Sequence, residues 1–100
     1  MAKFNFDKVE NYFHRLVVEH LMAEYADSEL AKIPGALEDV ACLALNQLPP
    51  RYVRHSVDAA FYLAGEPLET MKEKVRDAVK YAAKYVEKHP RRKPPRNSSD

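Results

Sequence analysis

Residues 39–52 read DVACLALNQLPPRY, in which a run of small and apolar residues stops at a double proline. The run repeats at helical spacing, which predicts a helix over about residues 36–47. The helix cannot continue through the Pro49-Pro50 pair, because neither ring can donate a backbone hydrogen bond. The Arg51-Tyr52 pair is therefore expected to leave the helix on a stiff, extended segment. Asn46 is expected to cap the end of this helix.

Two amphipathic helices are predicted on either side of this stretch. The first begins near Asp7, which can cap it, and fades near Asp27-Ser28. The last lies between Pro67 and Pro90, where a 3.6-residue apolar period opens and stops. The apolar residues expected on one face of the first helix are Val9, Tyr12, Phe13, Leu16, Val17, Leu21 and Met22.

The connections between these helices are less regular. Residues 28–31 could form a short helical turn, and Ile33-Pro34-Gly35 breaks the chain before the central helix. Residues 53–64 can be written as a short strand or as another small helix, since they mix β-branched and aromatic residues. We favour a helix there, with a brief extended piece at Tyr52–Arg54.

Length and composition indicate a single, mainly α domain. A chain of 100 residues has the usual size of one domain, and 46% hydrophobic with 31% charged residues is typical of a globular protein. We expect a bundle of about four helices over residues 1–90. Residues 91–100 are expected to form a disordered basic tail, because their proline, charge and serine leave little to bury.

Three features predict a cytoplasmic protein with no membrane partner. No apolar run approaches the roughly 20 residues that cross a bilayer. The N-terminal segment lacks the long uncharged stretch of a secretory signal. The single cysteine, Cys42, cannot form an intramolecular disulfide, and we interpret it as a small buried hydrophobic residue.

The central stretch also resembles a known family. Residues 43–52, LALNQLPPRY, preceded by Asp39-Val40, resemble the ALNxLPPxY core of the late competence development ComFB family of small bacterial cytosolic proteins. The layout of the chain is similar to that family over roughly residues 5–89. The resemblance implies a mainly helical, dimeric, non-enzymatic protein. It also implies a link to cyclic dinucleotide second messengers and to surface behaviour such as motility, biofilm or competence.

No metal site and no enzymatic activity are expected. Some ComFB-like proteins carry a zinc-associated cysteine cluster ahead of the ALN segment, where this chain has KIPGA at residues 32–36. Structural zinc needs about four Cys or His ligands at set spacings, and here one cysteine and four histidines are scattered. Gly35 and Gly65 are the only glycines, so the chain has no glycine-rich phosphate loop.

Residues 51–58, RYVRHSVD, with Tyr62 shortly after them, are where binding chemistry is expected, because they carry groups of the kind that hold a guanine dinucleotide. Such a ligand is held by arginine on a phosphate or base, a carboxylate on the guanine edge, and an aromatic face for stacking. This inventory favours cyclic di-GMP over cyclic di-AMP as the ligand, with no other cofactor. The candidate binding residues here are Arg51, Tyr52, Arg54, His55, Asp58 and Tyr62.

The same residues also have an ordinary structural interpretation. Arg54 and Asp58 are four apart and could form a helical salt bridge, while Tyr52 and Tyr62 could lie in a core or a dimer interface. The alternative function is then a dimeric protein-interaction adaptor that binds an unknown downstream protein and no small molecule.

Positive charge gathers at the end of the chain. Residues 80–100 carry seven Lys and Arg, whereas residues 1–40 carry eight acidic residues and only four Lys and Arg. Lys80, Lys84 and Lys88 are spaced by four and share one helical stripe, which continues into the tail. Arg91 and Arg92 complete the candidate set as phosphate contacts to the dinucleotide, unless this face only solubilises. Sequence-specific nucleic-acid binding is not expected, because no recognition motif accompanies a net charge of +1.

Overall fold

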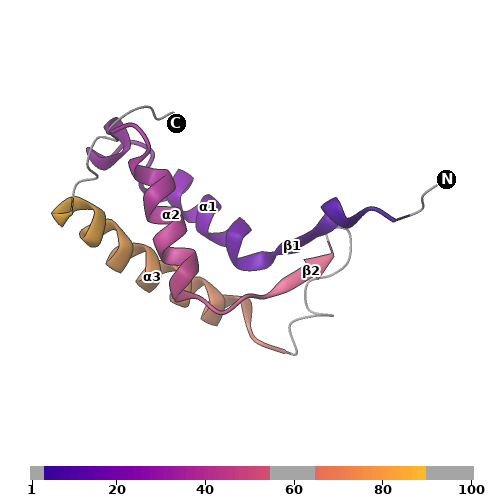
Figure 1. The fold of residues 1–100 in the computed structure, drawn as a ribbon. Coiled ribbons are helices and arrows are strands. Elements are labelled where there is room, and N and C mark those ends of the chain that lie inside the picture. The colour runs from indigo at the N-terminus through magenta and orange to yellow at the C-terminus, as the bar shows by residue number, and fades with distance from the viewer. Residues whose placement is uncertain (1–3, 55–64, 90–100) are drawn as a thin grey trace.

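In the part of the chain that the structure describes, three α-helices pack together and a two-stranded ribbon extends from them (Figure 1). This computed structural model describes residues 4–54 and 65–89. The helices are α1 (Tyr12–Glu24), α2 (Ala36–Gln47) and α3 (Leu68–Lys88), and the strands are β1 (Val9–Asn11) and β2 (Tyr52–Arg54). The described part of the chain is therefore mainly helical, as predicted.

Helix α1 begins later than predicted. Residues before it form a 3₁₀ turn, Phe6–Lys8, and then strand β1, so the predicted start near Asp7 is wrong. The cap is Asn11, whose side-chain oxygen accepts a hydrogen bond from the Phe13 N–H. Val9 lies in the strand and is exposed, because the backbone here pairs with β2 instead of closing helical turns.

Helix α2 has the predicted bounds, and glycine and proline set both ends. Gly35 precedes it with a φ of 80°, a left-handed conformation that glycine adopts without a steric penalty. At the other end Leu48 is extended, since the residue before a proline avoids the helical region. Leu48 is thus the C-cap and Asn46 lies inside the helix, so the predicted cap at Asn46 is wrong.

Strand β2 confirms the extended piece predicted at Tyr52–Arg54. It pairs antiparallel with β1 in the register Val9↔Arg54, Glu10↔Val53 and Asn11↔Tyr52. The additional helix expected toward residue 64 and the tail expected at residues 91–100 lie outside the described residues. The number of helices in the complete chain therefore stays a prediction.

The core lies between α3 and the two helices that cross it, and Val53 from β2 joins it (Figure 1). Helix α3 has 21 residues and buries an apolar stripe from Met71 to Ala83, so it can pack against both α1 and α2. None of the helices in the described ranges is long and apolar enough to cross a membrane. The largest fully buried side chains are Phe13, Val17, Val40, Met71, Val75 and Val79.

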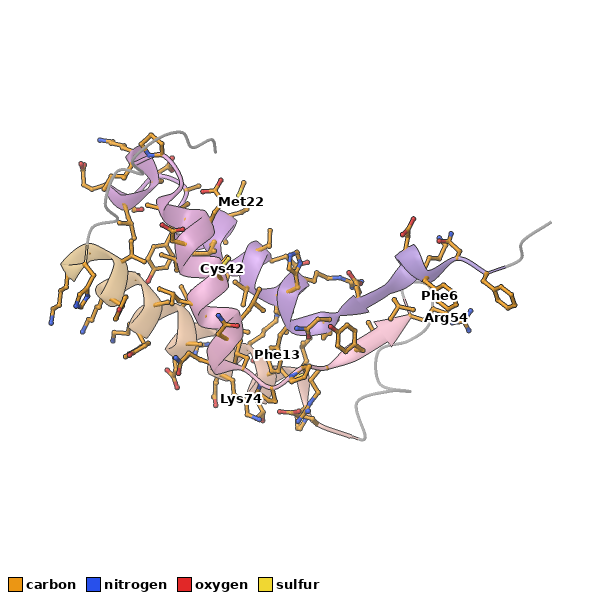
Figure 2. All side chains as sticks on the ribbon, in the orientation of Figure 1. Phe6, Phe13, Met22, Cys42, Arg54 and Lys74 are labelled. Carbon is orange, nitrogen blue, oxygen red and sulfur yellow. The ribbon has the colours of Figure 1, made fainter. Side chains whose placement is uncertain are left out.

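Cys42 lies on the outer side of α2, so the prediction that it is buried is wrong (Figure 2). Val40 and Ala44 are both fully buried, and each is two residues away from Cys42. Two residues along an α-helix turn the side chain by about 200°, which places the thiol opposite the buried stripe. Met22, predicted on the buried face of α1, is likewise 66% exposed.

Candidate functional site

The backbone of Arg51 is held at the point where α1 and β2 meet. Its N–H donates to the side-chain oxygen of Asn11 at 3.0 Å, and its carbonyl accepts from the Tyr12 N–H at 2.6 Å. Both partners lie at the start of α1, so the residue that follows the double proline is fixed to the N-terminal end of another helix. The Arg51 side chain therefore starts from a defined position.

That side chain belongs to an ion cluster of three residues. Arg51 Nε lies 3.1 Å from Glu66 Oε1, and Lys74 Nζ lies 2.8 Å from Glu66 Oε2. The Glu66 side chain is 15% exposed, whereas those of Arg51 and Lys74 are 36% and 43% exposed. We call this group the Arg51–Glu66–Lys74 cluster; it presents two cations to solvent around one sheltered carboxylate.

The electrostatics of the cluster favour the charged form of Glu66. The hydrogen bond from Lys74, followed by that from Arg51, lowers the pKa of Glu66 from its usual 4.5, against the opposing effect of burial. Two cations and one anion leave the cluster with a net positive charge at neutral pH. A phosphate group brought to it would meet two donors that are already positioned.

Tyr52 and Arg54 share the other face of β2. They are two residues apart, so their side chains point to one side of the ribbon, while Val53 between them is buried. Tyr52 is 59% exposed, which leaves its ring available for stacking. Figure 2 shows Arg54 beside Phe6 at the tip of the ribbon, with Lys74 at the helical body.

The structure therefore separates two arginines that the sequence groups together. Arg51 precedes β2 and turns to Glu66, whereas Arg54 ends β2, about 10 Å farther along an extended chain. A ligand that contacts both must lie along the ribbon. His55, Asp58, Tyr62, Arg91 and Arg92 lie outside the described residues, and the structure does not test them.

Glu66 and Lys74 are candidate site residues that the sequence interpretation missed. They stand 15 and 23 positions after Arg51, and no local spacing connects them to it. Glu66 comes just before Pro67, the N-cap of α3, and Lys74 projects from the second turn of that helix. The packing of α3 against α2 brings the three charges together, so the contact could not be found from helical periodicity.

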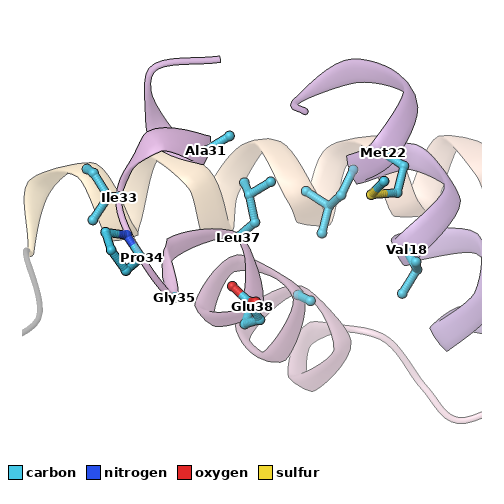
Figure 3. A pocket seen from close by; sticks show the side chains of 10 residues that line it. Val18, Met22, Ala31, Ile33, Pro34, Gly35, Leu37 and Glu38 are labelled. Atoms are coloured by element: carbon cyan, nitrogen blue, oxygen red, sulfur yellow. The ribbon is translucent and has the colours of Figure 1, made fainter. Parts of the chain in front are cut away.

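An apolar groove lies elsewhere, between α1, the turn at Leu30–Lys32 and α2 (Figure 3). It encloses about 480 Å³, and Figure 3 shows Val18, Met22 and Leu37 among its lining side chains. The candidate binding residues that the structure describes do not line it.

Within residues 4–54 and 65–89, no three His, Cys, Asp or Glu side chains come together in a way that could hold a metal ion.

The described arrangement places two cations, Arg51 and Lys74, near the exposed ring of Tyr52. No curated protein and no solved structure matches this chain. Residues 10–90 do match the family model described as late competence development protein ComFB. The matched region takes in all three helices, the PPRY segment and the Arg51–Glu66–Lys74 cluster. The chain therefore belongs to the late competence development protein ComFB family.

Proposed function

We propose that this protein is a non-enzymatic cytoplasmic receptor for a cyclic dinucleotide, cyclic di-GMP in preference to cyclic di-AMP. The observation that supports this most is the Arg51–Glu66–Lys74 cluster at the foot of a ribbon that displays Tyr52. Binding would be read by a downstream protein that controls surface behaviour such as motility, biofilm or competence.

The chemistry of the site suits a phosphodiester attached to a base. Arg51 donates a hydrogen bond from Nε to Glu66 and one from Nη1 to the Pro50 carbonyl. Further N–H groups of the same guanidinium remain able to face a phosphate. Lys74 supplies a second cation at the same carboxylate. Tyr52 offers a ring face to a base, and such stacking contributes about 1–3 kcal/mol per base.

The remaining candidate residues complete the site in this proposal. Asp58 would accept hydrogen bonds from the guanine edge, with His55 and Tyr62 beside it in the sequence. Arg91 and Arg92 would contribute further phosphate contacts. A homodimer suits the two-fold symmetry of the ligand, since two copies of one site can face its two halves.

The test is a titration of the purified protein with cyclic di-GMP, cyclic di-AMP, GMP and GTP, followed by calorimetry and by thermal unfolding. Cyclic di-GMP with a Kd of about 100 μM would stabilise the protein by about 1.4 kcal/mol at 1 mM, which raises Tm by roughly 6–10 °C. We expect such a rise with cyclic di-GMP, a smaller one with cyclic di-AMP and none with GMP. No rise with either cyclic dinucleotide would contradict the receptor proposal.

A second candidate, a dimeric adaptor without a small ligand, is favoured by the aromatic tip of the ribbon. Phe4 and Phe6 stack at a centroid distance of 6.0 Å and are 78% and 76% exposed, beside the exposed Val9. Exposed apolar patches of this kind commonly mark protein contacts. The double variant F4S/F6S distinguishes the two functions. An adaptor loses self-association in sedimentation with this change, whereas a receptor that uses the cluster keeps its nucleotide affinity.

A further inference from the structure

The last turns of α3 carry a repeated pair of residue types. Residues 80–89 read KYAAKYVEKH, so that a lysine followed by an aromatic residue recurs every four positions. We call this the lysine–aromatic ladder; its six members are Lys80, Tyr81, Lys84, Tyr85, Lys88 and His89. All six side chains are exposed, with Tyr81 at 56% and Tyr85 at 43%.

Core packing does not account for these rings. Ala78, Val79, Ala82 and Ala83 form the buried stripe of the same turns, and they contact α3's neighbours without help from the tyrosines. An exposed helical face needs only polar residues, yet here it displays an aromatic side chain in every turn. Their exposure therefore points to a contact outside the described residues of this chain.

Part of the ladder is already a flat platform. The rings of Tyr85 and His89 stack with centroids 4.2 Å apart and an interplanar angle of 21°. His89 Nδ1 lies 3.0 Å from the Tyr85 carbonyl oxygen, which holds the imidazole in place. The stacked pair leaves an outer face, and Tyr81 supplies a second ring one turn earlier. Ordered rings lose little side-chain freedom when a base stacks on them.

We propose that the lysine–aromatic ladder binds single-stranded nucleic acid without sequence preference. Proteins of this function pair cations that follow the phosphates with aromatic rings on which bases stack. Four helical residues rise about 6 Å, whereas one nucleotide of a stacked strand rises about 3.4 Å. A strand that gives one phosphate to each lysine is thus stretched, and its unstacked bases are free to meet the rings.

The charge of this end of the chain complements a polyanion. Between residues 80 and 100 the sequence has seven Lys and Arg against Glu87 and Asp100. Glu87 follows Lys84 by three positions and so lies beside the lysine stripe, where it offsets one of these positive charges. Lys74, in the proposed dinucleotide site, lies about 9 Å before Lys80 along the helix axis. The ladder and the proposed dinucleotide site share no residue, although Arg91 and Arg92 of that site follow the ladder closely in the sequence. Ladder variants therefore leave the Arg51–Glu66–Lys74 cluster unchanged, and either proposal can fail alone.

The experiment measures fluorescence anisotropy of labelled dT12 and rU12 with the full chain, in parallel with quenching of tyrosine fluorescence. We expect both oligonucleotides to bind and to quench, and an abasic strand of equal length to bind more weakly. Y81L/Y85L should weaken dT12 binding at least about 5-fold but leave the abasic strand unchanged, because stacking requires bases.

Charge is tested separately with a matched pair of triple variants. Neutralising all three ladder lysines to Gln should reduce the slope of log K against log salt by about 2, since each phosphate contact on a single strand contributes about 0.7. The control neutralises three exposed lysines elsewhere, Lys8, Lys32 and Lys72, and should leave the slope almost unchanged. The far-UV spectrum checks that all variants keep their helices.

Any of four results would overturn the proposal. The first is no binding of dT12 or rU12 at 50 mM salt. The second is equal affinity for dT12 and the abasic strand, and the third is equal effects of the two triple variants; either indicates unspecific electrostatic attraction. The fourth is a dimer that Y81L/Y85L dissociates, because the rings would then face a second copy of the chain.

Discussion

The side-chain oxygen of Asn11 accepts a hydrogen bond from the backbone N–H of Arg51, which comes 40 positions later, at 3.0 Å. The same oxygen caps α1 through the Phe13 N–H at 3.2 Å. One amide group therefore starts a helix and holds the residue that follows the double proline. This contact connects the local structure of the N-terminal segment to the position of the candidate binding site.

Replacing Asn11 by alanine should destabilise the protein by about 2–3 kcal/mol. The change removes a helix cap, which costs about 1 kcal/mol, and leaves the partly buried N–H of Arg51 without its acceptor. Thermal or urea unfolding measures the loss. The matched control is N5A, since Asn5 caps an exposed 3₁₀ turn and should cost less than about 0.5 kcal/mol. Equal stability of the two variants would contradict this role for Asn11.

Glu66→Gln should lower stability at pH 7, and the difference from the unmodified protein should shrink as the pH falls through the folded-state pKa of Glu66. The pKa of Glu66 is lower in the folded protein than its usual 4.5, so its stabilisation is present above that value. It is lost as the pH falls through the folded-state pKa. We expect a difference of about 1 kcal/mol at pH 7, because the cations are partly exposed. Urea unfolding from pH 3 to 7 checks this. If the free energies of unfolding of the variant and the unmodified protein changed in parallel with pH, the charge of Glu66 would not stabilise the fold.

Arg51→Ala and Lys74→Ala should each weaken cyclic di-GMP binding about 10-fold or more. Each removes a charged hydrogen-bond donor, a change that costs about 1.5–3 kcal/mol. Calorimetric titration gives the affinities. Lys72→Ala is the control, since this lysine is exposed on the same helix outside the cluster.

Glu66→Gln provides the second control for that prediction. This variant loses the negative charge of the cluster but keeps both cations, so its affinity for cyclic di-GMP should equal or exceed that of the unmodified protein. If it lost as much affinity as Arg51→Ala, the effect would reflect the structure of the cluster rather than contact with a phosphate.

Cys42 should react with a maleimide in the folded protein at a rate within a few-fold of that in urea. Its thiol lies on the exposed side of α2, so the reagent can reach it without prior unfolding of the protein. Mass spectrometry over time measures the rate, and Tm should fall by less than about 2 °C after modification. Protection by 100-fold or more would show that the thiol is covered in solution, for example by a second copy.

The bounds of α2 and α3 were predictable because proline and glycine act within a few residues. Gly35 and the Pro49-Pro50 pair bound α2, and Pro67 starts α3. The same proline pair explains the extended Tyr52–Arg54 segment. These signals depend on backbone geometry alone, so they need no knowledge of the rest of the fold.

The start of α1 and the surroundings of Cys42 were not predictable in the same way. Val9 fits the apolar period of a helix, yet pairing with β2 draws it into a strand. Cys42 has the character of a buried residue, but α2 turns it away from α3. In both cases a partner distant in sequence decides between two conformations or faces that are locally acceptable.

The sequence by itself thus determined the family, two helices with their limits, and the extended exit that carries Arg51 and Tyr52. Only the tertiary structure placed Glu66 and Lys74 around Arg51 and moved Arg54 to the far end of the ribbon. The physical reason is range: dihedral restrictions and helical periodicity act between neighbours, whereas an ion cluster forms only after helices have packed and brought distant charges within hydrogen-bond distance.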